Sequence, residues 1–102
     1  MSPLPREQAG ALFSELPDGW VLGEASLDAS FLFRTYLDGI AFVNRVAELA
    51  EAEGHHPDIA VHCRQVRLTL TTHAVKGLSE NDFILAAKVS QLVSNGEIVS
   101  PH

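Results

Sequence analysis

The chain has few of the residues that mark several classes of protein. It contains one cysteine, Cys63, so no internal disulfide can form, and residues 1–5 lack the basic start and long apolar run of a secretory signal. We therefore expect a reducing, cytoplasmic location. No run of about 18 residues is apolar and free of charge, so we expect no membrane-spanning helix.

Positive charge is also scarce. The 102 residues include 7 Lys+Arg against 13 Asp+Glu, a formal net charge of -6. A field of this sign repels phosphate backbones, so we expect no direct binding of nucleic acid. Hydrophobic residues make up 46% of the chain, the composition of a folded protein, and we expect a single domain over residues 1–102. A domain this small buries only about 60–70% of its unfolded surface, which favours oligomerisation.

Hydrophobic spacing predicts three helices. Apolar residues recur at helical intervals over residues 5–16, until a Pro-Asp-Gly turn ends the pattern. A second helix is expected from Asp38, a capping residue, to Gly54, a common helix terminator. A third is expected to open at Ser79–Asp82, where a capping residue stands three positions before an acid, and to close at Asn95-Gly96.

Four shorter segments are typical of strands. They cover residues 20–22, 30–36, 58–63 and 66–72, and they are rich in aromatic and aliphatic residues or alternate apolar with polar side chains. The predicted order is α-β-β-α-β-β-α. Short connections between paired strands indicate an α+β domain, in which a four-stranded antiparallel sheet is covered by helices on one face.

Three histidines are the most informative feature. His55 and His56 follow the second helix, and His73 follows the last strand. If the last two strands form a hairpin that turns at Arg64-Gln65, then Cys63 opposes Val66 and His56 lies across from His73 on the polar face of the sheet.

The residues around these histidines favour proton-transfer chemistry. Glu51 stands one helical turn before His55, and Pro57 restricts His56 to extended conformations. Imidazole is the side chain that, unperturbed, both gives and takes a proton near neutral pH. We therefore expect a site at which one group delivers a proton while another removes one.

These residues also fit roles other than proton transfer. The chain has no cysteine pair and no helical His-x-x-x-His, and adjacent histidines rarely bind one ion, so we expect no metal. Asp82 also fits a purely structural role as the acid of the Ser79 capping box. We expect Cys63 to be a small core residue and His62 to be solvated on the polar face.

Taken together, these residues resemble the signature of the pterin-4a-carbinolamine dehydratases. The signature consists of an acid, a His-His-Pro triplet, an aromatic, a later histidine and an aspartate. Its positions here are Glu51, His55-His56-Pro57, His73 and Asp82, with Leu70-Thr71-Thr72-His73 as matching context. The resemblance covers nearly all of residues 20–93. The chain departs from it at Cys63, where the family has an aromatic, a loss that would reshape the pocket.

The resemblance implies a reaction and roles. The family removes water from a 4a-hydroxytetrahydropterin left by aromatic amino acid hydroxylases. His55 and His73 would then act as acids, and His56 would position the pterin and assist proton removal. Glu51 and Asp82 would orient histidines or contact the ring, and Pro57 and Thr72 would lie at the substrate. No cofactor is implied, because the pterin is itself the substrate.

The resemblance also implies a homodimer formed by joining sheets edge to edge, or a homotetramer. Open sheet edges need covering, which a second copy provides. Two alternatives to the dehydratase stay open: a related protein diverted to another small molecule, and a protein-binding relative such as a transcription cofactor or a Rubisco assembly factor.

Overall fold

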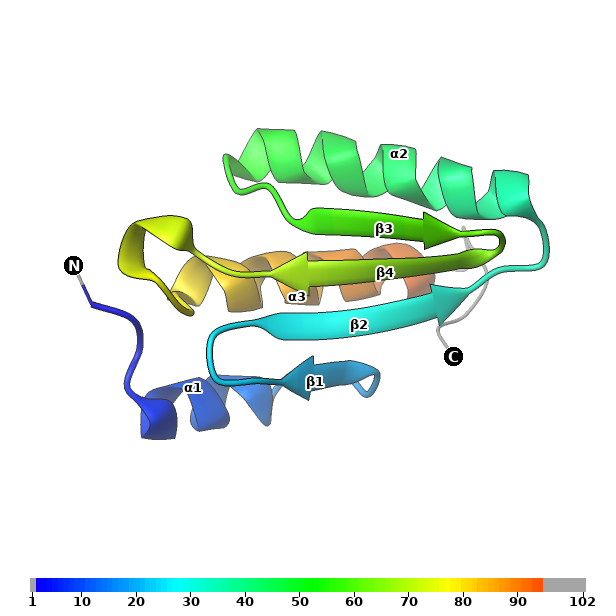
Figure 1. The fold of residues 1–102 in the computed structure, drawn as a ribbon. Helices are drawn as coiled ribbons and strands as arrows, with labels where there is room; N and C mark the ends of the chain where they lie inside the picture. Colours follow the sequence, from blue (N-terminus) through cyan, green and yellow to red (C-terminus); the bar gives the residue numbers. More distant parts are fainter. Residues whose placement is uncertain (1, 95–102) are drawn as a thin grey trace.

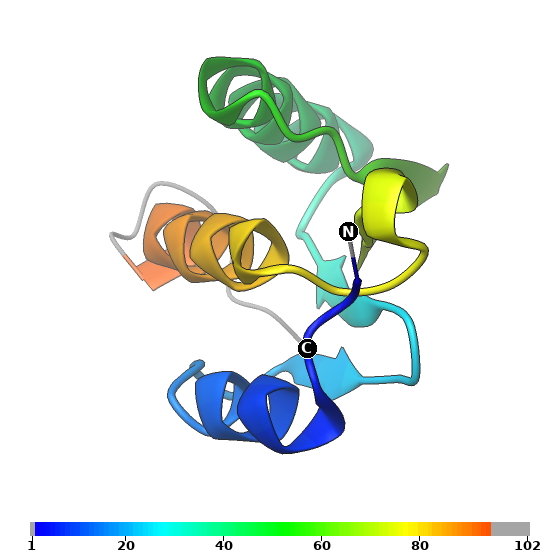
Figure 2. The ribbon, with the colours of Figure 1, turned by 90° about the vertical axis from the view of Figure 1, so that its left-hand side faces the viewer.

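A computed structural model describes residues 2–94, which form four strands and four helical segments. In chain order these are α1 (Arg6–Phe13), β1 (Trp20–Leu22), β2 (Leu27–Leu32), α2 (Tyr36–Glu53), β3 (Asp58–His62), β4 (Gln65–Leu70), a short 3-10 helix η1 (His73–Val75) and α3 (Glu80–Ser94). The strands form one antiparallel sheet in the order β1-β2-β4-β3. All three α-helices cover the same face of the sheet (Figures 1 and 2), which confirms the predicted α+β fold.

Buried and less buried side chains alternate along the two central strands, β2 and β4, and the buried ones form the inner face of the sheet. On β2 the buried residues are Leu27, Ala29 and Phe31, and on β4 every second residue from Val66 to Leu70 is buried. The intervening side chains are polar or only half-buried. A period of two therefore separates an apolar face, which the helices cover, from a polar face.

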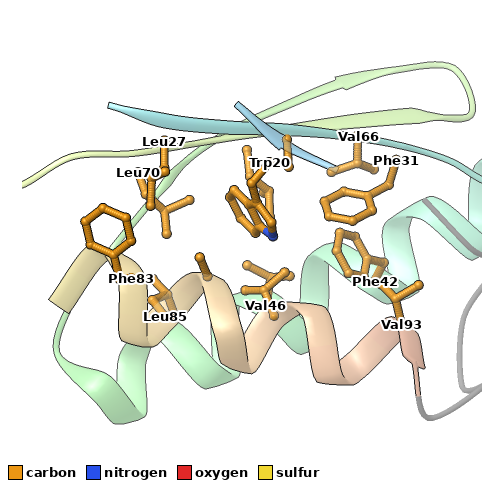
Figure 3. Packing of buried hydrophobic residues seen from close by; sticks show 14 of the residues in the cluster. Trp20, Leu27, Phe31, Phe42, Val46, Val66, Leu70, Phe83, Leu85 and Val93 are labelled. Carbon is orange, nitrogen blue, oxygen red and sulfur yellow. The ribbon is translucent and has the colours of Figure 1, made fainter. Parts of the chain in front are cut away.

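The two longer helices close the core from the other side. Four residues of α2 are buried, at three- and four-residue spacing: Gly39, Phe42, Val46 and Ala50. The Phe42 ring lies 4.9 Å from the ring of Phe31 and 5.1 Å from that of Phe33, centroid to centroid. Figure 3 shows the side chains of α2 and α3 meeting those of the sheet in one layer. This packing holds α2 and α3 side by side beneath the strands.

The boundaries of β2 and α2 differ from the prediction of a strand over 30–36 and a cap at Asp38. The strand runs from Leu27 to Leu32, because it pairs with β1 and β4 over that range. The N-cap of α2 is Thr35, whose Oγ1 accepts a hydrogen bond from the backbone N–H of Asp38 at 3.1 Å. Asp38 lies in the first turn instead, where its negative charge complements the helix dipole.

The hairpin of β3 and β4 turns one residue earlier than predicted, at Cys63-Arg64. Val61 faces Val66, and the pairing expected between Cys63 and Val66 is wrong. The backbone carbonyl of Arg64 accepts a hydrogen bond from the N–H of Phe33 at 2.9 Å, which fixes the turn against the chain leaving β2. Each residue now faces a partner two positions away from the predicted one, so the apolar row of β4 still faces the core.

Cys63 is also not the core residue that we expected. Its side chain is exposed, and its backbone has a φ of 52° at the first position of the turn. Both favoured types of two-residue hairpin turn require a positive φ at that position. In Figure 1 this turn lies at the end of the sheet opposite η1, away from the segments that carry the histidines.

The ends of α1 and α3 can also be compared with their predicted positions. The regular part of α1 stops at Phe13, and hydrogen bonds from Glu15 and Leu16 back to the carbonyls three residues earlier continue the turn to residue 16. The predicted closure of α3 at Asn95-Gly96 lies outside the described residues. His62 is exposed, as predicted.

Candidate active site

The predicted site residues gather at one end of the sheet. The last turn of α2 carries Glu51, and the chain leaving the helix carries His55 and His56. β4 leads into η1 through Thr72, and α3 begins beside them with Asp82 in its first turn. In Figure 1 these segments lie at the same end of the molecule, and in Figure 2 that end faces the viewer. Hydrogen bonds between the segments show that they are in contact.

The end of α2 aims His55. Gly54 adopts a left-handed conformation with a φ of 67°, and the N–H groups of Gly54 and His55 bond back to the last turn, the latter to the Ala50 carbonyl at 3.0 Å. This pair of bonds is the Schellman motif, which favours glycine because a Cβ is strained at such a φ. The motif ends the helix abruptly and turns the chain so that His55 faces α3.

His55 is held by a buried carboxylate. Its Nε2 lies 2.5 Å from Oδ1 of Asp82, and the two side chains are 13% and 0% exposed. An aspartate is rarely buried completely unless its charge is paired and hydrogen-bonded. Both oxygens of Asp82 have hydrogen-bond partners, so it serves as the fixed partner of His55.

One hydroxyl group and one backbone amide satisfy the second oxygen of Asp82. Oδ2 accepts a hydrogen bond from Oγ1 of Thr72 at 2.8 Å and from the backbone N–H of Ser79 at 2.9 Å. The hydrogen bond from the backbone N–H of Ser79 to Asp82 is one of the two hydrogen bonds of the predicted capping box. The Ser79 hydroxyl lies 2.7 Å from Oγ1 of Thr72 instead of capping the helix. The capping role and the site role of Asp82 are therefore both present.

His56 makes a second, exposed pair. Its Nε2 lies 2.8 Å from Oε1 of Glu51, and the two side chains are 67% and 81% exposed. Neighbouring histidines therefore take different carboxylates, one buried and one in solvent. Pro57 follows directly and is half-buried at the entrance to β3.

His73 does not face His56 across a strand pair, and that prediction is wrong. β3 begins only at Asp58 and β4 ends at Leu70, so both histidines lie outside the ladder and strand parity does not apply to them. His73 opens η1, where its side chain is exposed and makes no hydrogen bond within residues 2–94. Only the adjacent Thr72 ties this part of the chain to Asp82.

A cavity of about 420 Å³ adjoins the hydroxyl groups of this network. Its lining consists of Ser2, Leu4, Thr72, Val75, Ser79, Glu80, Asn81 and Ile84. Pockets for small molecules commonly span about 300–1,000 Å³ and mix apolar walls with a few polar groups. The hollow is wide open to solvent, and no histidine borders it.

Over residues 2–94, no three side chains of histidine, cysteine, aspartate or glutamate come together as ligands for one metal ion. Within the same range, no helix has the length and apolar character needed to cross a bilayer.

Sequence reasoning named most of these residues but missed Ser79 as part of the site. Its capping position was visible in the sequence, but its contact with Thr72 joins α3 to the end of β4. The partners of the two carboxylates were also left open, since Glu51 and Asp82 were both assigned to histidines in general.

Fold and site together define a class of protein. A small α+β domain holds two imidazole–carboxylate pairs at one end of its sheet, and one of the pairs is buried. Such pairs are suited to general acid–base catalysis on a small molecule.

Comparison with known proteins identifies the family. A sequence model described as pterin 4 alpha carbinolamine dehydratase matches residues 2–92, so the chain belongs to this family of hydro-lyases. A protein of Nitrosomonas eutropha, provisionally named pterin-4-alpha-carbinolamine dehydratase, is 47% identical over 91 residues, which are 89% of this chain and 80% of the relative. One of Xanthomonas campestris with the same provisional name is 48% identical over 83% of this chain and 73% of its own.

Solved structures agree with the fold. A transcriptional coactivator/pterin dehydratase from Brucella melitensis superposes with a TM-score of 0.81 at 29% identity, covering 89% of this chain and 98% of its own. A pterin dehydratase-like protein described as a RuBisCO assembly factor in the alpha-carboxysome gives 0.61 at 30% identity, covering 72% and 88%.

Proposed function

We propose that this protein dehydrates a 4a-hydroxytetrahydropterin to the quinonoid dihydropterin and water. The buried pairing of His55 with Asp82 is the observation that carries the proposal, because it joins two signature residues into one unit that can exchange protons. Membership of the dehydratase family supplies the substrate class.

The reaction requires an acid and a base at different atoms of one ring. The C4a–O bond breaks as the hydroxyl gains a proton and leaves as water, while N5 loses its proton and forms the new double bond. Electrons and atoms balance without an oxidant or reductant. The proposed chemistry therefore needs no metal or redox cofactor, only groups that give and take protons.

The geometry suits a division of roles between the histidines. We assign proton delivery to His55 and His73, and pterin positioning and assistance to proton removal to His56. Asp82 would orient His55 and Glu51 would orient His56, since each carboxylate lies within hydrogen-bond distance of that ring. Pro57 would lie beside the substrate, as would the exposed ring of His73.

The proposed substrate and product link this protein to other reactions. The substrate must come from a reaction that hydroxylates another molecule with a tetrahydropterin, such as that of an aromatic amino acid hydroxylase. Dehydration would return the pterin toward its reusable form. We also propose that the chain works as a homodimer or homotetramer, because β1 and β3 are open edges of the sheet.

The test is to generate the 4a-hydroxytetrahydropterin in situ and to follow its dehydration by ultraviolet absorbance with and without the protein. His56→Ala and His73→Ala should each lower turnover by about 100-fold or more, as is typical when a general acid or base is lost. His62→Ala is the matched control, because His62 is exposed on the polar face of β3 and contacts none of the site residues. Wild-type rates in both site variants would refute the assignment.

A second candidate function is assembly of other proteins. It is favoured by the likeness to the RuBisCO assembly factor, although that superposition covers less of this chain than the one with the Brucella protein. The same assay separates the two: a protein that neither binds pterin nor speeds dehydration would move the assignment to the second function.

A further inference from the structure

The hydrogen atoms around Asp82 can be placed from the contacts alone. Thr72 has one hydroxyl hydrogen, and its Oγ1 lies 2.8 Å from Oδ2 of Asp82, which is an acceptor there. The Thr72–Ser79 contact of 2.7 Å must then use the hydrogen of Ser79. The chain of donation therefore runs from the Ser79 hydroxyl to Thr72 and on to Asp82.

The hydrogen between Asp82 and the imidazole of His55 can be placed in the same way. Oδ2 of Asp82 already accepts hydrogen bonds from two donors, the Thr72 hydroxyl and the Ser79 amide, so it is not itself a donor in these contacts. A carboxylate has no hydrogen to give, so the 2.5 Å contact at Oδ1 needs a hydrogen on Nε2 of His55.

We infer that Thr72 and Ser79 are positioning residues of the dehydration reaction, which hold Asp82 as an acceptor and thereby leave Nδ1 as the nitrogen of His55 that exchanges protons with the substrate. The inference rests on the proposed function for its reaction. For its hydrogen-bond pattern it rests only on the described contacts. It changes the expectation for Thr72, whose hydroxyl hydrogen is committed to Asp82 and is not free for a substrate.

Burial makes the hydroxyl of Thr72 hard to replace as a donor to Asp82. Asp82 is fully buried, and Thr72 and Ser79 are half-buried, so water has little access to Oδ2. If one hydroxyl is removed, a buried acceptor loses a donor that solvent cannot fully replace. The carboxylate would then be free to rotate, which would release Nε2 of His55.

Matched variants separate the hydroxyl group from the shape of the side chain. Thr72→Val has nearly the same shape and no hydroxyl, whereas Thr72→Ser keeps the hydroxyl and loses a methyl group. Ser79→Ala removes the hydroxyl but keeps the backbone N–H that bonds Asp82. Circular dichroism and urea unfolding of each variant establish that it folds.

The first measurement is nitrogen NMR of protein labelled at the histidine ring nitrogens, under conditions where His55 is neutral. In the wild type and in Thr72→Ser we expect Nε2 of His55 to carry the hydrogen and Nδ1 to be bare. In Thr72→Val we expect a mixed or reversed tautomer. A hydrogen on Nδ1 in the wild type, or an unchanged tautomer in a folded Thr72→Val, would overturn the inference.

The second measurement is the kinetics of dehydration. Loss of a hydrogen bond to a charged group should lower kcat by about tenfold or more in Thr72→Val, with Thr72→Ser within about threefold of the wild type. KM should change little, because a positioning residue does not touch the substrate. A raised KM with unchanged kcat would mean that Thr72 binds substrate directly, contrary to the inference.

The two measurements fail independently. If the wild type does not catalyse dehydration, the proposed function is refuted by the kinetics, and the NMR result still decides whether the hydroxyl chain sets the tautomer of His55. If dehydration occurs but the tautomer does not depend on Thr72, only the inference about positioning is refuted.

Discussion

His55 and Asp82 lie 27 positions apart in the sequence, and Nε2 of the first is 2.5 Å from Oδ1 of the second. This contact joins the chain leaving α2 to the first turn of α3. An ion pair between Lys88 and Glu53, with 2.6 Å between Nζ and Oε2, links the same two helices nearby. The orientation of the imidazole therefore depends on how α2 and α3 pack beneath the sheet.

The first prediction concerns the charge of Asp82. In Asp82→Asn the amide oxygen can still accept hydrogen bonds, but its NH2 group cannot accept a hydrogen from Nε2 of His55. We expect dehydration to fall by about 100-fold or more, and the free energy of unfolding to fall by about 1–3 kcal/mol. Stopped-flow absorbance and urea titration measure the two effects.

The control for this variant is Glu51→Gln. The Glu51 and His56 side chains are both largely exposed, so solvent screens their interaction. We expect the free energy of unfolding to change by less than about 1 kcal/mol. A loss as large as that of Asp82→Asn would contradict the assignment of the buried pair as the structural one.

A second prediction tests the left-handed cap that aims His55. A Cβ on Gly54 would meet no atom within 4 Å, so Gly54→Ala is strained only by its backbone φ of 67°. We expect a loss of about 1–2 kcal/mol in the free energy of unfolding and slower dehydration, because the cap also directs His55. Gly10→Ala is the control: its Cβ also meets nothing within 4 Å, but its helical backbone should make the change stabilising by about 0.5–1 kcal/mol. Equal effects of the two substitutions on urea unfolding would refute this reasoning.

The turn at Cys63 gives a third prediction. Cys63→Gly should raise the free energy of unfolding by about 0.5–1 kcal/mol, because glycine adopts a φ of 52° without the strain of a Cβ, part of the gain being offset by backbone entropy. Cys63→Ala keeps the Cβ and should be nearly neutral. Dehydration should not change in either variant, since the turn lies at the far end of the sheet. A Cys63→Ala variant that gains as much as Cys63→Gly would show that the φ angle is not the cause.

A fourth prediction concerns the core that holds α2 in place. Phe42 is fully buried and packs against the rings of Phe31 and Phe33. Phe42→Ala should lower the free energy of unfolding by about 3–5 kcal/mol through lost contacts and the cavity left behind. Leu37→Ala, on the same helix but 73% exposed, should change it by less than about 0.5 kcal/mol. Comparable losses in thermal or urea unfolding would mean that Leu37 is covered in solution by a second copy or another partner.

Much of the fold could be predicted because it depends on local periodicity. The alternation in β4 and the three- and four-residue spacing in α2 each assign a buried face from neighbouring residues only. The predicted strand 20–22 is confirmed residue for residue. The errors were at element boundaries, as at Thr35 and Cys63. Alternative caps and turns there differ little in free energy, so contacts with other segments decide which one forms.

The site was predicted as a set of residues but not as an arrangement. Glu51 and His56 belong to one short segment, so their proximity follows from the helix end. The position of His73 could not be deduced, because it depended on a hairpin register that does not extend beyond Leu70. Ser79 was understood only as a cap, because its contact with Thr72 crosses between two segments.

The sequence by itself determined the buried faces of β4 and α2, the order of the helices and strands, and that histidines and carboxylates stand near the ends of those elements. These properties depend on the period of the side chains and on local backbone preferences. Only the tertiary structure decided that Asp82 takes His55 and that Glu51 takes His56. That choice depends on how α2 and α3 pack against the sheet, because such contacts join residues whose separation along the chain carries no information about their distance in space.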